Sequence, residues 1–256
     1  MTPFFELENL RRTFGGLVAV NDLSFTVDAG SIVAMIGPNG AGKSTVFNLI
    51  TGVYRPTAGT VALEGQTLSG LTTDRIAARG IARTFQNIRL FAFMSALDNV
   101  MAGHHARMHA SMLDSLLHTP RQRREERRVR EDARALLRFV GVERDAGNYA
   151  RNLPYGSQRR LEIARALASE PKLLLLDEPA AGMNPREKED LVGLIGRIRG
   201  TGVTVFLIEH DMNLVMNVSE RVTVLDHGEK IAEGSPQAVR SDPRVIEAYL
   251  GAPEIA

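Results

Sequence analysis

The chain has 256 residues, of which 44% are hydrophobic, and its formal net charge at pH 7 is +1. This length and composition support a large core in one or two domains and exclude a disordered chain. The near-zero charge argues against a global attraction to nucleic acid or anionic lipid, and the absence of cysteine excludes disulfides, thiolate zinc sites and cysteine nucleophiles.

Neither a signal peptide nor a membrane span is expected. Residues 1–6 lack the basic and apolar segments of a signal peptide. No apolar run approaches the ~20 residues that cross a bilayer. If the protein works at a membrane, we expect another chain to cross it.

Strands are predicted at the start of the chain. Residues 4–35 alternate between apolar and polar, with turn signals at 15–16 and 28–30, which predicts antiparallel strands, and residues 57–65 continue this pattern. Residues 31–36 form an apolar run typical of a buried strand, and residues 45–50 suit a helix.

A glycine-rich run lies between that strand and that helix. Residues 37–45 read G-P-N-G-A-G-K-S-T, the P-loop pattern G-x-x-x-x-G-K-[ST]. Its glycines allow left-handed backbone angles, so that successive N–H groups point into one concavity. We expect Lys43 to contact the β- and γ-phosphates, Ser44 to ligate Mg²⁺, and the helix N-terminus to attract the phosphates. The predicted nucleoside triphosphate site consists of Gly37, Pro38, Asn39, Gly40, Ala41, Gly42, Lys43, Ser44 and Thr45.

Helical periodicity replaces strands from about residue 95 to 140. We therefore predict a helical subdomain at residues 87–152, inserted into an α/β core made of residues 1–86 and 153–256. Two features of this insertion could indicate ligands, but both are better explained by an exposed helix. The arginine-rich run at 121–130 contains favourable i,i+4 ion pairs and no aromatic residues, so we expect no nucleic-acid partner. His105 and His109 lack a carboxylate or cysteine at ligand spacing.

An alternation of strands and helices returns in the second half. The predicted segments are strand 172–176, helix 185–199, strand 203–208 and helix 212–218. Such alternation predicts a parallel sheet that binds ligands at the carboxyl ends of its strands.

Acidic residues follow the first of these strands. Asp177 and Glu178 come after four leucines at residues 173–176. We expect Asp177 to hold Mg²⁺ and Glu178 to accept a proton from the attacking water. His210 follows the strand at 203–208, where its imidazole can hydrogen-bond the γ-phosphate or position the water.

Together these motifs resemble the ATPase subunits of ABC transporters, over nearly the whole chain. The resemblance implies that Phe14 stacks on adenine, and that Gln86 is the Q-loop glutamine, which touches Mg²⁺ or water and senses the membrane partner. It aligns residues 153–157 with the L-S-G-G-Q signature, which binds ATP from the opposite subunit. Residues 181–184 then form the D-loop, and His210 is the switch histidine.

The signature and the D-loop depart from the family pattern. The usual Ser, first Gly and Gln are replaced by Pro154, Tyr155 and Ser157, whereas Leu153 and Gly156 keep their usual identities. Without the serine hydroxyl, we expect the backbone N–H groups from Gly156 and Ser157 onward to bind the phosphates. In the D-loop, Asn184 replaces aspartate, which removes a charge and keeps a hydrogen-bonding amide.

The segments that contain these departures resemble one subfamily, the branched-chain amino-acid uptake ATPases. The similar segments are residues 80–91, 153–165, 178–185 and 208–212, and the insertion at about 101–130 with the C-terminal 243–251 fits the larger of the two ATPase types. The resemblance implies ATP and Mg²⁺ as cofactors, and a second ATPase subunit, itself or a paralogue. It also implies two permease subunits, an indirect solute-binding partner, and a peripheral place on the cytoplasmic face of the membrane.

Two questions stay open from sequence alone. The apolar residues Phe91, Phe93 and Met94, after Gln86, suit a groove for a permease coupling helix or an ordinary subdomain core equally well. Alternative functions are ATPases of urea or amide uptake or of lipid export, and, less compatible with the pattern, non-transport ABC ATPases or P-loop kinases and GTPases. The interpretation as a P-loop kinase or GTPase lacks support because no guanine-specific N-K-x-D segment occurs.

Overall fold

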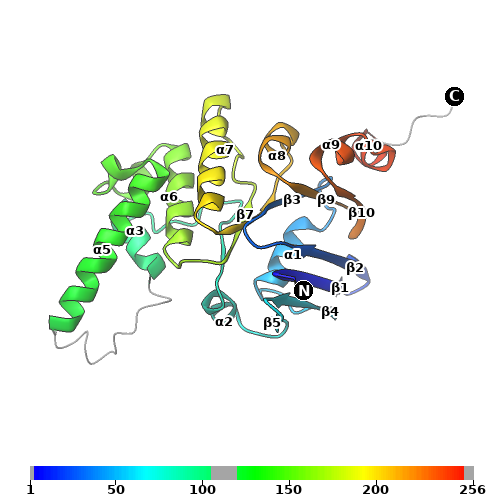
Figure 1. Cartoon of the computed structure of the whole chain (residues 1–256), viewed down its shortest axis with the longest axis horizontal. Helices are drawn as coiled ribbons and strands as arrows, with labels where there is room; N and C mark the ends of the chain where they lie inside the picture. Colours follow the sequence, from blue (N-terminus) through cyan, green and yellow to red (C-terminus); the bar gives the residue numbers. More distant parts are fainter. Residues whose placement is uncertain (1–2, 105–119, 251–256) are drawn as a thin grey trace. The chain divides into compact units, whose positions relative to one another are not determined.

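The chain folds into two compact units in this computed structural model, which describes residues 3–104 and 120–250 (Figure 1). The first unit joins Met1–Ile81 to Lys172–Ala256, and the second is Ala82–Pro171. These units differ from the predicted division at residues 87 and 152, because the helix that follows the signature packs with the helices of the second unit. The predicted domain division itself stays a prediction.

A four-stranded antiparallel sheet opens the first unit. Its strand order is β2 (Leu17–Val27), β1 (Phe5–Phe14), β4 (Ala58–Leu63) and β5 (Gln66–Thr67). The predicted turn at residues 15–16 joins β1 to β2 and brings Phe14 opposite Leu17. The antiparallel prediction is wrong beyond residue 30, because the fully buried strand that follows pairs in the other sheet.

The second sheet of this unit has six strands. Their order is β10 (Glu229–Gly234), β9 (Arg221–Asp226), β3 (Ile32–Ile36), β8 (Thr204–Ile208), β7 (Leu173–Asp177) and β6 (Ile81–Arg83). Strands β9, β3, β8 and β7 are parallel, and β10 is antiparallel to β9. Every residue of β3, β7 and β8 is buried, as expected for parallel strands covered on both faces. The predicted α/β fold is confirmed.

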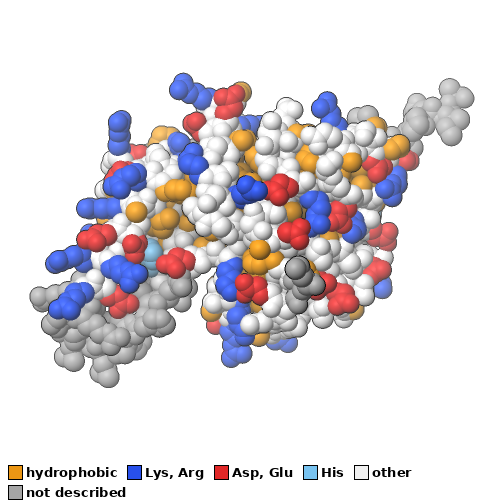
Figure 2. All heavy atoms as spheres, in the orientation of Figure 1, with side chains coloured by type: hydrophobic (Ala, Val, Ile, Leu, Met, Phe, Trp, Pro, Cys, Tyr) orange, Lys and Arg blue, Asp and Glu red, His pale blue; other side chains and the backbone are white. Residues whose placement is uncertain are grey.

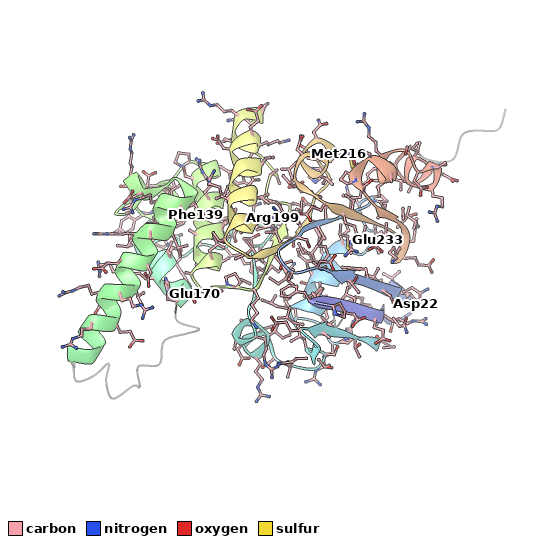
Figure 3. The ribbon with its side chains drawn as sticks, in the orientation of Figure 1. Asp22, Phe139, Glu170, Arg199, Met216 and Glu233 are labelled. Carbon is pink, nitrogen blue, oxygen red and sulfur yellow. The ribbon has the colours of Figure 1, made fainter. Side chains whose placement is uncertain are left out.

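Helices connect and cover these strands. They are α1 (Lys43–Ile50), α2 (Thr73–Ala78), α7 (Pro185–Gly200), α8 (Met212–Val218), α9 (Pro236–Arg240) and α10 (Pro243–Leu250). The predictions of α7 and α8 are confirmed. At the end of α7, Arg199, labelled in Figure 3, donates hydrogen bonds to the carbonyl of Gly30 at 3.0 Å and to Glu220 at 3.0 Å. These bonds tie α7 to the loop before β3.

The second unit is mainly helical. It contains α3 (Ala96–Gly103), α5 (Pro120–Val140), the short 3₁₀ helices η2 (Glu143–Asp145) and η3 (Ala150–Asn152), and α6 (Tyr155–Leu167). The three α-helices pack on one another. The approach of α3 to α6 is close, because a Cβ on Gly103 would lie 2.2 Å from the carbonyl oxygen of Arg165. The predicted helical character of this part of the chain is confirmed.

The arginine-rich surface of α5 carries charges of both signs (Figure 2). Two of its ion pairs join residues four apart, Glu126 to Arg130 at 3.5 Å and Arg128 to Asp132 at 3.8 Å. Such exposed pairs add little stability, but they make α5 a self-paired helix face. Residues 105–119 of the predicted insertion at 101–130, including His105 and His109, lie outside the described residues.

Candidate nucleotide-binding site

Three neighbouring strands end together at one edge of the six-stranded sheet. β8 lies between β3 and β7, and its Ile208 is opposite both Met35 and Asp177. The P-loop follows β3 and Glu178 follows β7. His210 lies just after the end of β8. Parallel α/β sheets bind their ligands at such an edge. The first unit therefore brings the P-loop and two of the predicted catalytic side chains, Glu178 and His210, to one place.

The P-loop glycines have the backbone conformations that the motif predicts. The φ angle is 151° at Gly37, 84° at Gly40 and 102° at Gly42. A Cβ on Gly37 would lie 2.0 Å from the carbonyl oxygen of Leu225, and one on Gly42 would lie 2.4 Å from that of Ala19. Any side chain at these two positions would collide with the neighbouring backbone, so the tight curve of the loop depends on glycine.

The turn between β9 and β10 supports the loop. The N–H of Gly228 donates to the carbonyl of Ala41 at 3.0 Å, and the N–H of Asn21 donates to the carbonyl of Gly228 at 2.8 Å. Gly228 has a φ of 84°, and a Cβ there would lie 2.9 Å from the carbonyl oxygen of Ala19. The sequence D-H-G-E at residues 226–229 signals a turn, but it does not reveal this contact with the P-loop.

Lys43 is held inside the curve of the loop. It begins α1 and is only 7% exposed. Its Nζ donates to the carbonyls of Gly37 at 2.7 Å and Pro38 at 2.9 Å. Burial lowers the pKa of Lys43, and the nearby carboxylates of Glu178 and Asp177 oppose that shift. Phosphate oxygens can replace the two carbonyls as acceptors, because an ammonium group has three rotatable donors.

Glu178 has an uncommon backbone conformation just after β7. Its φ is 45°, a left-handed value that non-glycine residues seldom adopt. Its N–H donates to the carbonyl of Ile208 at 2.9 Å, which joins the ends of β7 and β8. The side chain is 18% exposed, and Oε2 lies 3.7 Å from Nδ1 of His210. The two predicted catalytic side chains therefore face each other.

The oxygen donors near the P-loop suit a magnesium ion that also binds phosphate. Mg²⁺ usually takes one or two protein oxygens together with phosphates and waters. Ser44 lies exposed in the first turn of α1, and Asp177, 3% exposed, ends β7. In the part of the chain that the structure describes, no group of three His, Cys, Asp or Glu side chains could hold a metal ion. The donor set therefore fits an ion that depends on the nucleotide.

Phe14 ends β1 with part of its ring exposed. The ring is 36% exposed, meets Tyr54 edge to face at 5.1 Å, and has the guanidinium of Arg12 4.4 Å from its centroid. Since Ala19 of the adjacent β2 abuts Gly42, the hairpin end that carries Phe14 lies beside the P-loop.

The remaining predicted site residues belong to the second unit. Gln86 is exposed in the loop after β6, and its carbonyl accepts a hydrogen bond from Arg159 of α6. Arg159 is 2% exposed, donates to the carbonyl of Phe85 at 2.5 Å and pairs with Glu162 at 3.3 Å. Burial raises the pKa of Glu162, and the N–H of Arg89 and the charge of Arg159 oppose that shift. Arg159, which no sequence motif marks, ties the Q-loop backbone to the helix after the signature.

The signature residues form the start of α6. Leu153 is buried, Gly156 is buried in the first helical turn, and Ser157 is half-buried. The cap position holds Pro154, whose side chain has no acceptor, so the first N–H groups of the helix have no side-chain cap. Tyr155 accepts a hydrogen bond from Arg159 at 3.2 Å. This helix start suits the anion-binding role expected of it.

In the D-loop, Asn184 acts as a helix cap. Its Oδ1 accepts from the N–H of Glu187 at 3.0 Å, and the carboxylate of Glu187 accepts from the N–H of Asn184 at 2.9 Å. This capping box gives the asparagine a local structural role, because amides cap helices as well as carboxylates do.

The apolar segment after Gln86 is exposed rather than buried. Phe91 is 52% exposed and Phe93 is 73% exposed. Asn99, fully buried, holds the segment by accepting from the N–H of Phe91 at 2.9 Å and donating to its carbonyl at 3.1 Å. A hollow of about 370 Å³ lies next to it, lined by Arg83, Phe91, Ala102, Gly103, Glu162, Arg165 and Ala166. Ordinary subdomain core is therefore the wrong interpretation for Phe91 and Phe93.

Comparison with known proteins identifies the family. Residues 20–181 match the family described as ABC transporter, and residues 229–255 match the one described as branched-chain amino acid ATP-binding cassette transporter. The high-affinity branched-chain amino acid transport ATP-binding protein BraF of Pseudomonas aeruginosa is 47% identical, over 97% of this chain and 98% of its own length. The chain belongs to the ABC transporter ATP-binding subunits, in the branched-chain amino-acid transport group. The predicted ATPase class is thereby confirmed.

Other members of the ABC transporter family are also similar over most of the chain. LivG of Escherichia coli, described like BraF, is 45% identical over 97% of this chain and 98% of its own. The lipopolysaccharide export protein LptB of Haemophilus influenzae is 35% identical over 95% of each chain. Among solved structures, the ADP conformation of the cassette MJ1267 has a TM-score of 0.86 at 32% identity, covering 98% of this chain and 100% of that one. The dimeric bacterial cassette MJ0796 has a TM-score of 0.77 at 27% identity, covering 91% and 98%.

None of the helices within residues 3–104 and 120–250 has the length and apolar character to cross a bilayer.

Proposed function

We propose that this chain hydrolyses ATP to energise the uptake of branched-chain amino acids through separate permease subunits. The observation that carries this proposal is the contrast in similarity between relatives. BraF and LivG, named for branched-chain amino acid transport, are 47% and 45% identical, whereas LptB, named for lipopolysaccharide export, is 35% identical. The assignment of the substrate rests on this contrast, because in our proposal the ATPase subunit does not touch the amino acid.

In the proposed mechanism, different residues bind the phosphates, the adenine, the metal ion and the attacking water. The N–H groups of the P-loop and Lys43 bind the phosphates, and Phe14 stacks on adenine. Ser44, Asp177 and Gln86 would hold Mg²⁺, which would neutralise phosphate charge. Glu178 accepts a proton from the attacking water, and His210 holds the γ-phosphate or the water. The 3.7 Å between Glu178 and His210 supports a joint role for them.

A second ATPase subunit completes the site in this proposal. The signature residues Leu153, Gly156 and Ser157 of one subunit bind the ATP that lies on the P-loop of the other, as the uncapped start of α6 suggests. Closure of the pair on ATP moves the permeases, and hydrolysis reopens it. The resemblance to the dimeric cassette MJ0796 supports this arrangement. The partner subunit is either a second copy or a paralogue.

Replacing Gly156 with aspartate tests the signature. The added carboxylate repels the phosphates at the start of α6, so we expect dimer-dependent hydrolysis to fall by about tenfold or more while a single subunit still binds ATP normally. Steady-state hydrolysis and equilibrium ATP binding measure the two effects. Gly147→Asp is the matched control, because Gly147 is exposed in the same unit and a Cβ there meets nothing within 4 Å. Loss of ATP binding by Gly156→Asp would contradict the assigned role.

A permease helix is the proposed occupant of the hollow beside Phe91. Exposed apolar side chains on a rigid loop are typical of a protein interface. Arg165 and Glu162 both line the hollow, so its wall presents charges of both signs to a helix that enters it. Helices commonly bind such grooves through a few apolar anchors.

Replacing Phe93 with glutamate tests this interface. We expect the fraction of the subunit that is captured by detergent-solubilised permeases to fall by about tenfold, because a buried unpaired carboxylate is costly. Val53→Glu is the control, since Val53 is 51% exposed and lies in the other unit. Equal capture of both variants would place the permease elsewhere.

Isolation of the intact complex tests the function as a whole. We place the subunit on the cytoplasmic face of the membrane, bound to permeases. Affinity capture from solubilised membranes is expected to recover two permeases, and the reconstituted complex with its solute-binding protein is expected to accumulate leucine, isoleucine or valine on ATP hydrolysis. Transport of urea, another amide or a lipid instead would replace the proposed substrate.

A further inference from the structure

A fully buried carboxylate lies next to the proposed catalytic pair. Glu209 follows β8 and is 0% exposed. Its Oε1 accepts a hydrogen bond from the N–H of Ala180 at 2.9 Å, and its Oε2 accepts from the N–H groups of His210 at 3.2 Å and Asp211 at 3.5 Å. Burying a charged side chain is costly unless such donors compensate it. Burial raises the pKa of Glu209, and these N–H groups and the charge of His210 oppose the shift.

The hydrogen bonds of Glu209 connect two loops of the proposed site. Ala180 lies in the turn that begins with Glu178, whose carbonyl accepts from the N–H of Ala181 at 3.2 Å. His210 lies in the loop after β8. Each carboxylate oxygen therefore serves a different loop, and the side chain bridges the two.

The far ends of both loops are held by other contacts. Asp211 pairs with Lys188 of α7 at 2.5 Å and caps α8 by accepting from the N–H of Leu214 at 3.2 Å. Asn184 and Glu187 close the capping box of α7. With these ends held, Glu209 is the side chain that sets how the two loops meet close to Glu178.

We propose that Glu209 is a positioning residue for ATP hydrolysis, whose carboxylate holds the turn of Glu178 and the backbone of His210 at the distance that catalysis needs. This inference rests on the catalytic roles proposed for those two residues. Glu209 itself does not touch the substrate. A small displacement of a catalytic group can cost about a hundredfold in rate, so a residue acting only through the backbone can have a large effect.

Glu209→Gln is the decisive variant. An amide has one acceptor oxygen, so it can serve one loop while its NH₂ group opposes the N–H of the other. We expect kcat to fall about ten- to a hundredfold, with the KM for ATP and the equilibrium affinity for ATP changed by less than about twofold. Glu187→Gln is the matched control at the other end of the turn, because glutamine can replace glutamate in a capping box. It is expected to hydrolyse ATP at the wild-type rate.

Further variants distinguish a failure of the role proposed for Glu209 from a failure of the role proposed for Glu178. If Glu209→Gln fails to fold, Glu209→Asp retains the charge but is one methylene shorter, and the same loss of kcat at constant KM is expected. In a Glu178→Gln background, Glu209→Gln should cause no further loss, since both changes disable one unit. Wild-type kcat in a folded Glu209 variant, or a parallel loss of ATP affinity, would overturn the inference. Wild-type turnover of Glu178→Gln would instead refute the proposed base.

Discussion

Glu178→Gln is expected to bind ATP with normal affinity and to turn it over about a hundred times more slowly or worse, the usual effect of losing a general base. The amide has the size of the carboxylate but cannot accept a proton from water. Binding should survive because the phosphates are held by the P-loop and Lys43. Equilibrium ATP binding and steady-state hydrolysis of the same preparation measure the two quantities.

The structure provides a matched control for this variant. Glu170, labelled in Figure 3, is exposed and has a φ of 48°, close to the 45° of Glu178. Glu170→Gln therefore makes the same chemical change at the same kind of backbone position, outside the proposed site. We expect it to hydrolyse ATP normally. Unchanged turnover in Glu178→Gln would rule out its role as the base, and loss of ATP binding would make it a binding residue.

The parts of the fold that were predictable are those in which local pattern and burial coincide. Four consecutive leucines suit a strand that is buried on both faces, so residues 173–176 predicted β7 and placed Asp177 at its end. The P-loop was equally clear, since the left-handed angles of Gly37, Gly40 and Gly42 are the reason that the motif contains glycine.

The parts that sequence analysis missed depend on contacts between distant segments. The pattern of α6 shows an apolar face but not the helices that cover it, and only the structure shows that α6 packs with α3 and α5. Arginine is expected on the surface, yet Arg159 is buried because the carbonyls of Phe85 and Gln86 accept hydrogen bonds from its guanidinium group. No sequence pattern marks Glu209, and only the positions of three N–H groups reveal its role.

Lys43→Ala is expected to weaken ATP binding by about ten- to a hundredfold, which corresponds to the roughly 1.5–3 kcal/mol of a hydrogen bond to a charged group. The helix itself should persist, because alanine is the best helix former and the carbonyl of Gly42 still accepts from the N–H of Val46 at 3.0 Å. Equilibrium titration with ATP measures the change.

The same variant also removes the donor that the loop uses internally. In the structure Nζ bonds the carbonyls of Gly37 and Pro38, and ATP must compete with them for the ammonium group. The expected loss of ATP affinity therefore reflects the difference between phosphate and carbonyl oxygens as acceptors for the ammonium group. This difference is smaller than the full value of a phosphate contact. Lys172→Ala is the control, because Lys172 precedes β7 at its amino end, and its ammonium group pairs with Glu64 at an exposed position. Wild-type affinity in Lys43→Ala would mean that backbone N–H groups and the start of α1 hold the phosphates without the lysine.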